Sequence, residues 1–119
     1  MPFRFEELVS AKGLAYVRVH VSGEIGVADA REYVGKFGAG GPYHRKHTLS
    51  YVEKGTEYGA EPRKMFLAMG LHAPHATVTS SALVRAGINL MTRFSLKGAK
   101  YRMFAAEPEA IAWLEGQEI

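Results

Sequence analysis

Apolar and polar residues alternate strictly along residues 14–21. A period of two is typical of a strand with one buried face, and valine packs well on a pleated sheet. The pattern therefore predicts a strand, which we place in the middle of a sheet. Its two sides are Ala15, Val17, Val19 and Val21 on one face, and Tyr16, Arg18, His20 and Ser22 on the other.

A weaker alternation over residues 3–9 predicts an edge strand before this one, with Phe3 and Phe5 among its apolar positions. Gly13 can adopt the positive φ of a tight turn at little cost. The chain is therefore expected to open with a β-hairpin, in which residues 10–13 form the turn.

The next segment, residues 27–37, follows the period of a helix. Asp29 near its start and Lys36 near its end have the charges that the helix dipole favours, and Gly38 is a typical stop. The apolar positions at i, i+3, i+4 and i+7 form one face: Ala30, Tyr33, Val34 and Phe37.

Strands and helices continue to alternate in the rest of the chain. The predicted strands are 48–52, 76–79 and 101–104, and the predicted helices are 61–70, 82–95 and 107–116. The order ββαβαβαβα over residues 1–119 predicts a single α/β domain. We expect its sheet to be mixed, mostly parallel and five-stranded, with helices covering it.

Composition narrows the class of protein. The chain has 119 residues, 47% hydrophobic and 23% charged, which suits one globular domain. It contains no apolar run that could span a bilayer and no signal-peptide pattern, so we expect a cytoplasmic protein. The absence of cysteine excludes disulfides and cysteine-bound metals. The net charge of +3 is spread along the chain, so we do not expect nucleic-acid binding.

No catalytic motif is present: the chain lacks a G-x-S-x-G elbow, a phosphate-binding loop and a metal signature. We therefore expect a protein that is not an enzyme and uses no cofactor. Two H-x-x-H pairs would form a metal site only if they converged. We expect loop histidines instead, because i and i+3 diverge in an extended chain and proline interrupts the second pair. The pairs are His44 with His47, and His72 with His75.

The helix at 61–70 is more apolar than an amphipathic surface helix should be. Packing against the core would account for the apolar residues on one face of this helix. Its remaining exposed edge would form a dimer contact or the wall of an apolar pocket. The residues concerned are Met65, Phe66, Leu67, Met69 and Leu71. The polar face of the 14–21 strand carries Tyr16, Arg18 and His20. These residues form either a hydrogen-bonded core group or a ligand-binding patch, and we favour the core group.

The last third of the chain carries a resemblance. A strand that ends in Phe104 is followed, after a few residues, by a helix with the pattern E-A-x-A-W-L over residues 109–114. This arrangement resembles the SpoIIAA-like family, a branch of the STAS-type fold of sulfate transporters and anti-sigma-factor antagonists. The resemblance implies a small α/β domain with helices mainly on one side of a mixed sheet. It also implies a protein that acts by binding another protein, or a small apolar or anionic ligand.

Classical members of this fold place a phosphorylatable serine, in an aspartate-serine-glycine setting, before the helix that follows the third strand. Residues 53–59 read E-K-G-T-E-Y-G and contain no serine, so Thr56 is the nearest hydroxyl. We expect contacts with an unidentified protein partner at Thr56, Tyr58 and residues 65–71, and a homodimer. The alternative is a lipid-like ligand held between the 61–70 helix and the sheet. Ser80 and Ser81 precede a predicted helix. A serine at this position either caps the helix or forms a site for an anion or a modification.

Overall fold

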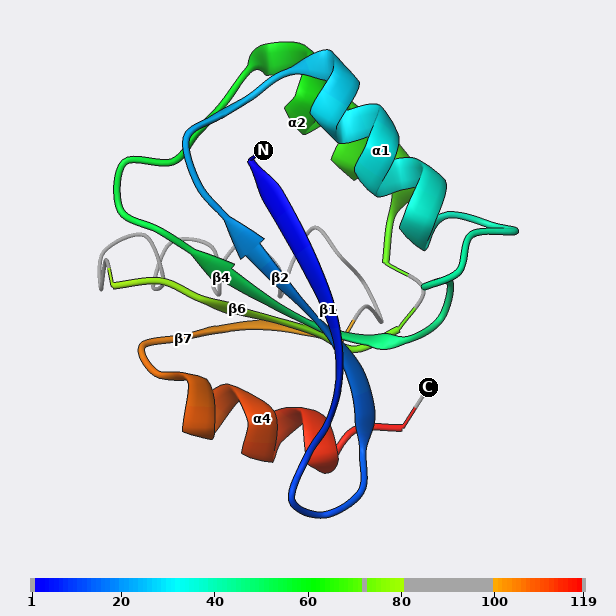
Figure 1. Ribbon diagram of the computed structural model, residues 1–119, viewed down its shortest axis with the longest axis vertical. Helices are drawn as coiled ribbons and strands as arrows, with labels where there is room; N and C mark the ends of the chain where they lie inside the picture. Colours follow the sequence, from blue (N-terminus) through cyan, green and yellow to red (C-terminus); the bar gives the residue numbers. More distant parts are fainter. Residues whose placement is uncertain (1, 72, 81–99, 119) are drawn as a thin grey trace.

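The computed structural model describes residues 2–71, 73–80 and 100–118. Their main feature is a mixed five-stranded sheet with the order β1-β2-β4-β6-β7 (Figure 1). β1 and β2 pair antiparallel, and all the other pairs are parallel. The strands are β1 (Phe3–Val9), β2 (Ala15–Val21), β4 (His47–Val52), β6 (His75–Val78) and β7 (Tyr101–Phe104).

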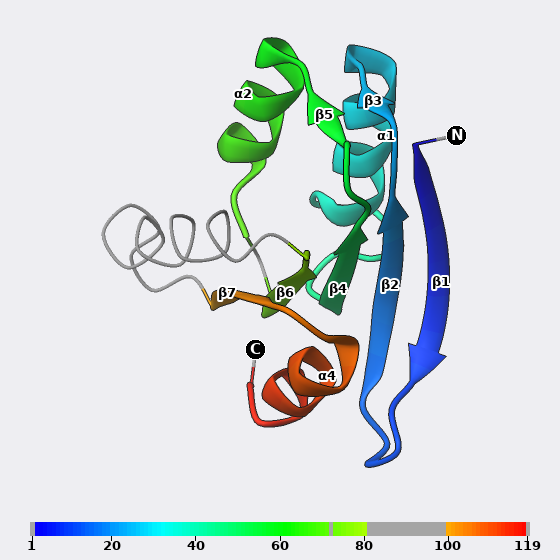
Figure 2. The same cartoon turned by 90° about the vertical axis from the view of Figure 1, so that its left-hand side faces the viewer.

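Helices lie on both faces of this sheet (Figures 1 and 2). α1 (Val27–Phe37) and α2 (Ala60–Met69) lie side by side over one face, and α4 (Glu107–Glu115) covers the other. The resemblance implies helices mainly on one side of the sheet. Of the three described helices, two share one face and the third lies on the other. No helix in the described ranges is long and apolar enough to cross a membrane.

Each face of the sheet has its own apolar core. The first lies under α1 and α2 and contains the buried valines of β2, as the alternation predicted, together with Phe3, Ile25, Tyr33 and Phe37. The second lies under α4 and contains Tyr16, Leu49, Ala76, Val78, Ala110 and Leu114. β2 contributes residues to both cores, Val17, Val19 and Val21 to the first and Tyr16 to the second, so its two faces are specified together.

The predicted position of the β2 strand in the middle of the sheet is wrong. β2 has β1 on one side and β4 on the other, and the central strand is β4. His47, Thr48, Leu49 and Ser50 of β4 are all buried, as expected for a strand covered on both faces. Strict alternation marks a strand with two different faces, whereas the crossover connections decide which strand is central.

A two-stranded parallel sheet was not predicted. It pairs β3 (Glu24–Ile25) with β5 (Glu57–Tyr58), inside two segments that lie between predicted elements. Two residues are too few to show a periodicity, so this pairing has no sequence signature. The predicted helix at 82–95 lies outside the described residues. The other predicted elements are confirmed, and their ends match or differ by one residue.

Candidate functional site

A cleft of about 330 Å³ lies at the carboxyl ends of the parallel strands. Ligand sites in parallel α/β sheets commonly form at this edge. Val52 and Val78 contribute apolar surface at the ends of β4 and β6. The remaining lining residues combine an aromatic ring, two opposite charges, two hydroxyls and one small side chain: Tyr51, Glu53, Lys54, Thr79, Ser80 and Ala105.

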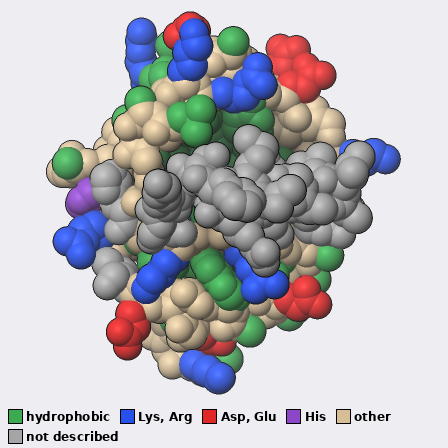
Figure 3. Space-filling model, turned by 180° about the vertical axis from the view of Figure 1, so that it is seen from behind, with side chains coloured by type: hydrophobic (Ala, Val, Ile, Leu, Met, Phe, Trp, Pro, Cys, Tyr) green, Lys and Arg blue, Asp and Glu red, His purple; other side chains and the backbone are tan. Residues whose placement is uncertain are grey.

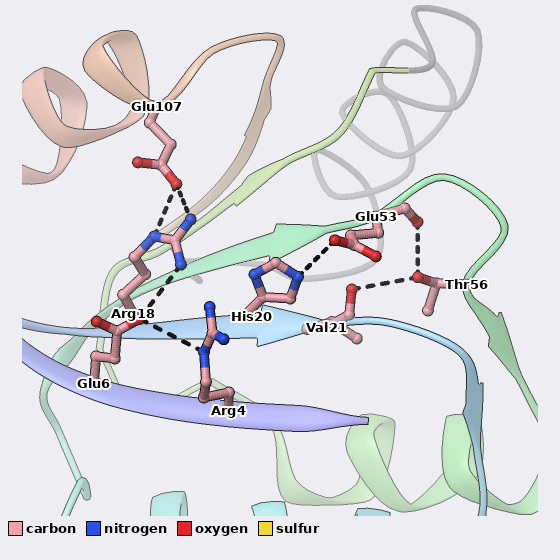
Figure 4. A network of polar contacts seen from close by, with 8 residues as sticks. All are labelled: Arg4, Glu6, Arg18, His20, Val21, Glu53, Thr56 and Glu107. Atoms are coloured by element: carbon pink, nitrogen blue, oxygen red, sulfur yellow. Dashed lines mark hydrogen bonds and ion pairs between the residues drawn. The ribbon is translucent and has the colours of Figure 1, made fainter. Parts of the chain in front are cut away.

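The loop on one rim of this cleft is held by its own hydrogen bonds (Figure 4). The Thr56 hydroxyl donates to the carbonyl of Glu53 at 2.7 Å and lies 3.4 Å from the carbonyl of Val21. The Glu57 amide donates to the Gly23 carbonyl at 3.0 Å, which joins the loop to the segment between β2 and β3. Thr56, a predicted contact residue, is therefore a loop-forming residue whose hydroxyl is already engaged.

His20 joins β2 to the same rim. Its Nε2–H donates to Oε1 of Glu53 at 2.9 Å (Figure 4). Its ring lies 5.6 Å from the ring of Tyr51. Its Nδ1 is buried and has no hydrogen-bond partner in the described part of the chain. His20 was expected to be a hydrogen-bonded group, and among the described residues it forms a hydrogen bond at Nε2 but not at Nδ1. The bond at Nε2 holds Glu53 at the cleft.

Arg18, on the same polar face of β2, is bound by carboxylates. Its Nε and Nη2 both donate to Oε1 of Glu107, at 2.8 and 2.5 Å, and its Nη1 lies 3.6 Å from Oε1 of Glu6 (Figure 4). These contacts connect β2 to the first turn of α4 and to β1. The pKa of Tyr16 is raised, mainly by burial and secondly by the nearby Glu107 carboxylate. Arg18 therefore fastens α4 to the sheet, which is a structural role.

Arg18→Met is expected to lower the free energy of unfolding by about 1–3 kcal/mol, because it leaves Oε1 of Glu107 without the guanidinium that donates to it twice. Arg63→Met is the matched control, since Arg63 is an exposed residue of α2 and should contribute less than about 0.5 kcal/mol. Urea unfolding measures both variants. Equal losses would show that the Arg18–Glu107 contact does not hold α4 in place.

A buried polar cluster lies on the opposite face of the sheet, below α1 and α2. Ser50 Oγ and His75 Nε2 are 2.8 Å apart, and the Tyr101 hydroxyl donates to Oγ1 of Thr77 at 2.8 Å. Burial raises the pKa of Tyr33, and a hydrogen bond with Ser50 acts in the opposite direction. These residues come from β4, β6, β7 and α1, so only strand register brings them together.

The Ser50–His75 pair has the composition of a nucleophile and its base. Burial, however, lowers the pKa of His75 to about 4, and an imidazole with that pKa is a poor base at neutral pH. Ser50 itself is only 5% exposed. The pair is therefore best explained as a hydrogen bond that satisfies two buried polar groups. The sequence does not indicate this pair, because the two residues are 25 positions apart.

The histidines of the two H-x-x-H pairs have separate partners. His44 Nδ1 donates to the Phe37 carbonyl at 3.1 Å, and His47, which is buried, donates from Nε2 to the Gln117 carbonyl at 2.8 Å. His75 bonds to Ser50, and His72 lies outside the described residues. Within the described ranges, no group of three His, Asp or Glu residues is placed to hold a metal ion.

The apolar helix α2 divides its predicted contact residues between core and surface. Phe66 and Met69 pack against the first core, and Phe66 lies 5.2 Å from Tyr33 in an edge-on contact. Tyr58 is directed to the same rings, 6.0 Å from Phe66, and burial raises its pKa to about 12. Leu67 is 72% exposed, and Met65 is half-buried.

The space between α2 and the sheet is small. A cavity of about 20 Å³ lies there, with Met69, Leu71, Tyr33 and His75 in its lining. This volume holds about one water molecule. This hollow is too small for a lipid-like ligand, and the carrier alternative stays a prediction.

The two serines proposed as an anion or modification site are placed differently. Ser80 is exposed and lines the cleft, on which Lys54 supplies a positive charge. Ser81 lies outside the described residues, so the predicted pair remains a prediction. Elsewhere, Lys and Arg side chains are spaced around the face shown in Figure 3 and do not form one continuous basic patch there.

The chain was compared with protein-family models, curated proteins and solved structures, and none of them matches it. A function is therefore inferred from the fold, the cleft and the contacts around them.

Proposed function

We propose that the protein is a non-catalytic binding or regulatory module of the SpoIIAA-like, STAS type. It acts by binding a partner protein at the cleft formed by the carboxyl ends of β4 and β6. The β1–β2 hairpin, followed by parallel β4, β6 and β7, with α1 before β4 and α2 between β4 and β6, supports this fold assignment. The proposal that the protein binds a partner rests on the cleft.

The size and lining of the cleft suit one side chain of a partner. Its volume of about 330 Å³ is at the lower end of the range for small-molecule sites, which is roughly 300–1,000 Å³. Half-buried Val52 offers apolar contact beside the buried Val78, and Glu53 and Lys54 place both charges on the rim. A central apolar contact surrounded by polar groups is the usual arrangement of a protein-binding hot spot.

The rim is organised before any partner arrives. Glu53 is held by His20 through its side chain and by Thr56 through its carbonyl, and β3–β5 pairing fixes the far end of the loop. A loop that is already ordered loses little conformational entropy on binding. This organisation favours recognition by the loop and the cleft together.

Ala105→Trp tests the proposal, because Ala105 is exposed and lines the cleft, so an indole at this position would fill it. Ala112→Trp is the matched control, since Ala112 is an exposed residue of α4 that does not line the cleft. Tagged wild type and both variants are used to capture proteins from the source cell extract, and the bound proteins are identified by mass spectrometry.

The expected result is a protein retained by the wild type and by Ala112→Trp, with retention by Ala105→Trp reduced about tenfold or more, as for loss of a hot spot. Unchanged thermal unfolding of Ala105→Trp shows that the fold is intact. Equal retention by all three proteins would contradict binding at the cleft, as would the absence of any specifically retained protein.

A further inference from the structure

The free edge of β1 is a second feature of the fold that is suited to binding. β1 is an outer strand of the five-stranded sheet, with β2 on its inner side (Figure 2). None of the described strands pairs with its outer side. A seven-residue edge strand presents a row of backbone N–H and C=O groups that can pair with another chain.

The hairpin's hydrogen bonds fix which backbone groups of β1 face outward. The Pro2 carbonyl accepts from the Ser22 amide at 3.0 Å, so Pro2 and Ser22 form a bonded pair. Bonded and non-bonded pairs alternate along an antiparallel ladder, so the even-numbered residues of β1 bond to β2. The odd-numbered residues therefore direct their N–H and C=O groups away from β2: Phe3, Phe5, Glu7 and Val9.

Side-chain charge distinguishes the ways in which two copies of β1 can pair. Antiparallel pairing about a two-fold axis places the residue on the axis opposite its own copy. An axis at Arg4, Glu6 or Glu7 would therefore put like charges side by side, which is destabilising. An axis at either end of β1 would leave only a short overlap.

An axis at Phe5 avoids both problems. Phe5 then faces Phe5 of the second copy, Arg4 faces its Glu6, and Glu6 faces its Arg4. Aromatic pairs and pairs of opposite charge across strands are both stabilising. In this register the outward-facing residues are opposite one another, so each such pair exchanges two backbone hydrogen bonds.

The side chains that this register needs are accessible. Arg4 is 69% exposed and Glu6 is 42% exposed, and their own contact within β1 is a loose 3.9 Å. An open groove of about 510 Å³ adjoins the first half of β1, with Phe3, Arg4 and Phe5 in its lining. α1 contributes Glu32 and Lys36 to the same groove, one charge of each sign. A self-complementary surface needs both signs on each copy.

We infer that β1 is a self-association site. Two copies of this chain pair antiparallel through β1 with Phe5 at the two-fold axis, which joins two five-stranded sheets into one continuous sheet. β2 separates β1 from β4 and β6, where the cleft lies, so both copies keep the cleft open. Such a dimer presents two identical clefts.

Charge reversal tests the register. Arg4→Glu and Glu6→Arg are each expected to weaken self-association about tenfold or more, because each places like charges opposite one another. Mixing the two single variants restores opposite charges at both positions and should give a mixed dimer, and the double variant should self-associate as the wild type does. Lys64→Glu, on α2, is the exposed control. Sedimentation velocity and native mass spectrometry measure the oligomers.

A backbone variant tests the edge without the Glu6 contact to Arg18. The Glu7 amide faces outward, and proline is tolerated at such an edge position because it removes no bond to β2. Glu7→Pro should therefore be folded and monomeric, whereas Glu7→Thr, which loses the same ion pair with Lys46, should remain dimeric. A wild type that is monomeric at all concentrations would overturn the inference, as would dimers unaffected by these substitutions. Ala105→Trp should remain dimeric, so failure at the cleft and failure at β1 are distinguishable.

Discussion

Leu49→Ala is expected to lower the free energy of unfolding by about 2–5 kcal/mol, the usual range for a buried leucine truncated to alanine. Leu49 has 0% exposure on the central strand β4 and belongs to the core under α4. Its removal leaves a cavity between the sheet and α4 that the neighbouring strands are poorly placed to fill. Urea unfolding followed by circular dichroism measures the change.

Leu67→Ala is the control for this experiment, because it is the same substitution at a leucine that is 72% exposed. We expect a change of less than about 0.5 kcal/mol there. A loss at Leu67 as large as at Leu49 would mean that α2 is packed differently, with Leu67 and not Phe66 facing the first core.

His75 should make stability depend on pH between about 6.5 and 4. Burial lowers the pKa of His75 from 6.5 to about 4, so the folded protein keeps the ring neutral in this window. The unfolded chain binds a proton as the pH falls below 6.5, whereas the folded chain does so only near pH 4. Stability therefore decreases as the pH is lowered through the window, by a total on the order of 3 kcal/mol.

His75→Gln is expected to remove this part of the pH dependence, because glutamine does not titrate and its amide can still bond to Ser50. The measurement is the free energy of unfolding at several pH values for the wild type, His75→Gln and the control His44→Gln. His44 has a separate hydrogen bond to the Phe37 carbonyl. The prediction fails if His75→Gln and the wild type lose stability in parallel as the pH falls.

The two proposed binding regions have different physical origins. The cleft combines side chains from strand ends and connections, so its specificity depends on individual residues such as Glu53 and Ala105. The β1 edge offers backbone hydrogen bonds, and its specificity comes from the order of charges along the strand. A partner bound at two clefts of one dimer would gain avidity only if its own sites match their spacing.

Local pattern was sufficient for most of the elements. Alternation located β2, helical spacing located α1, and proline and glycine marked the ends of α4, because each of these signals arises from neighbouring residues on one element. The valine face of β2 was also assigned correctly as a core face. These features follow from the sequence by itself.

Tertiary structure decided which segment covers each face of a strand or helix. Arg18 and Glu107 are 89 positions apart, and the sequence does not indicate that they pair. Phe66 and Leu67 are adjacent apolar residues of α2, yet only the docking of α2 beside α1 makes one a core residue and the other a surface residue. The central position of β4, the β3–β5 pairing and the cleft depend in the same way on long-range register. Periodicity specifies which side of an element is apolar, whereas the partner that covers it is chosen by packing between segments distant in the chain.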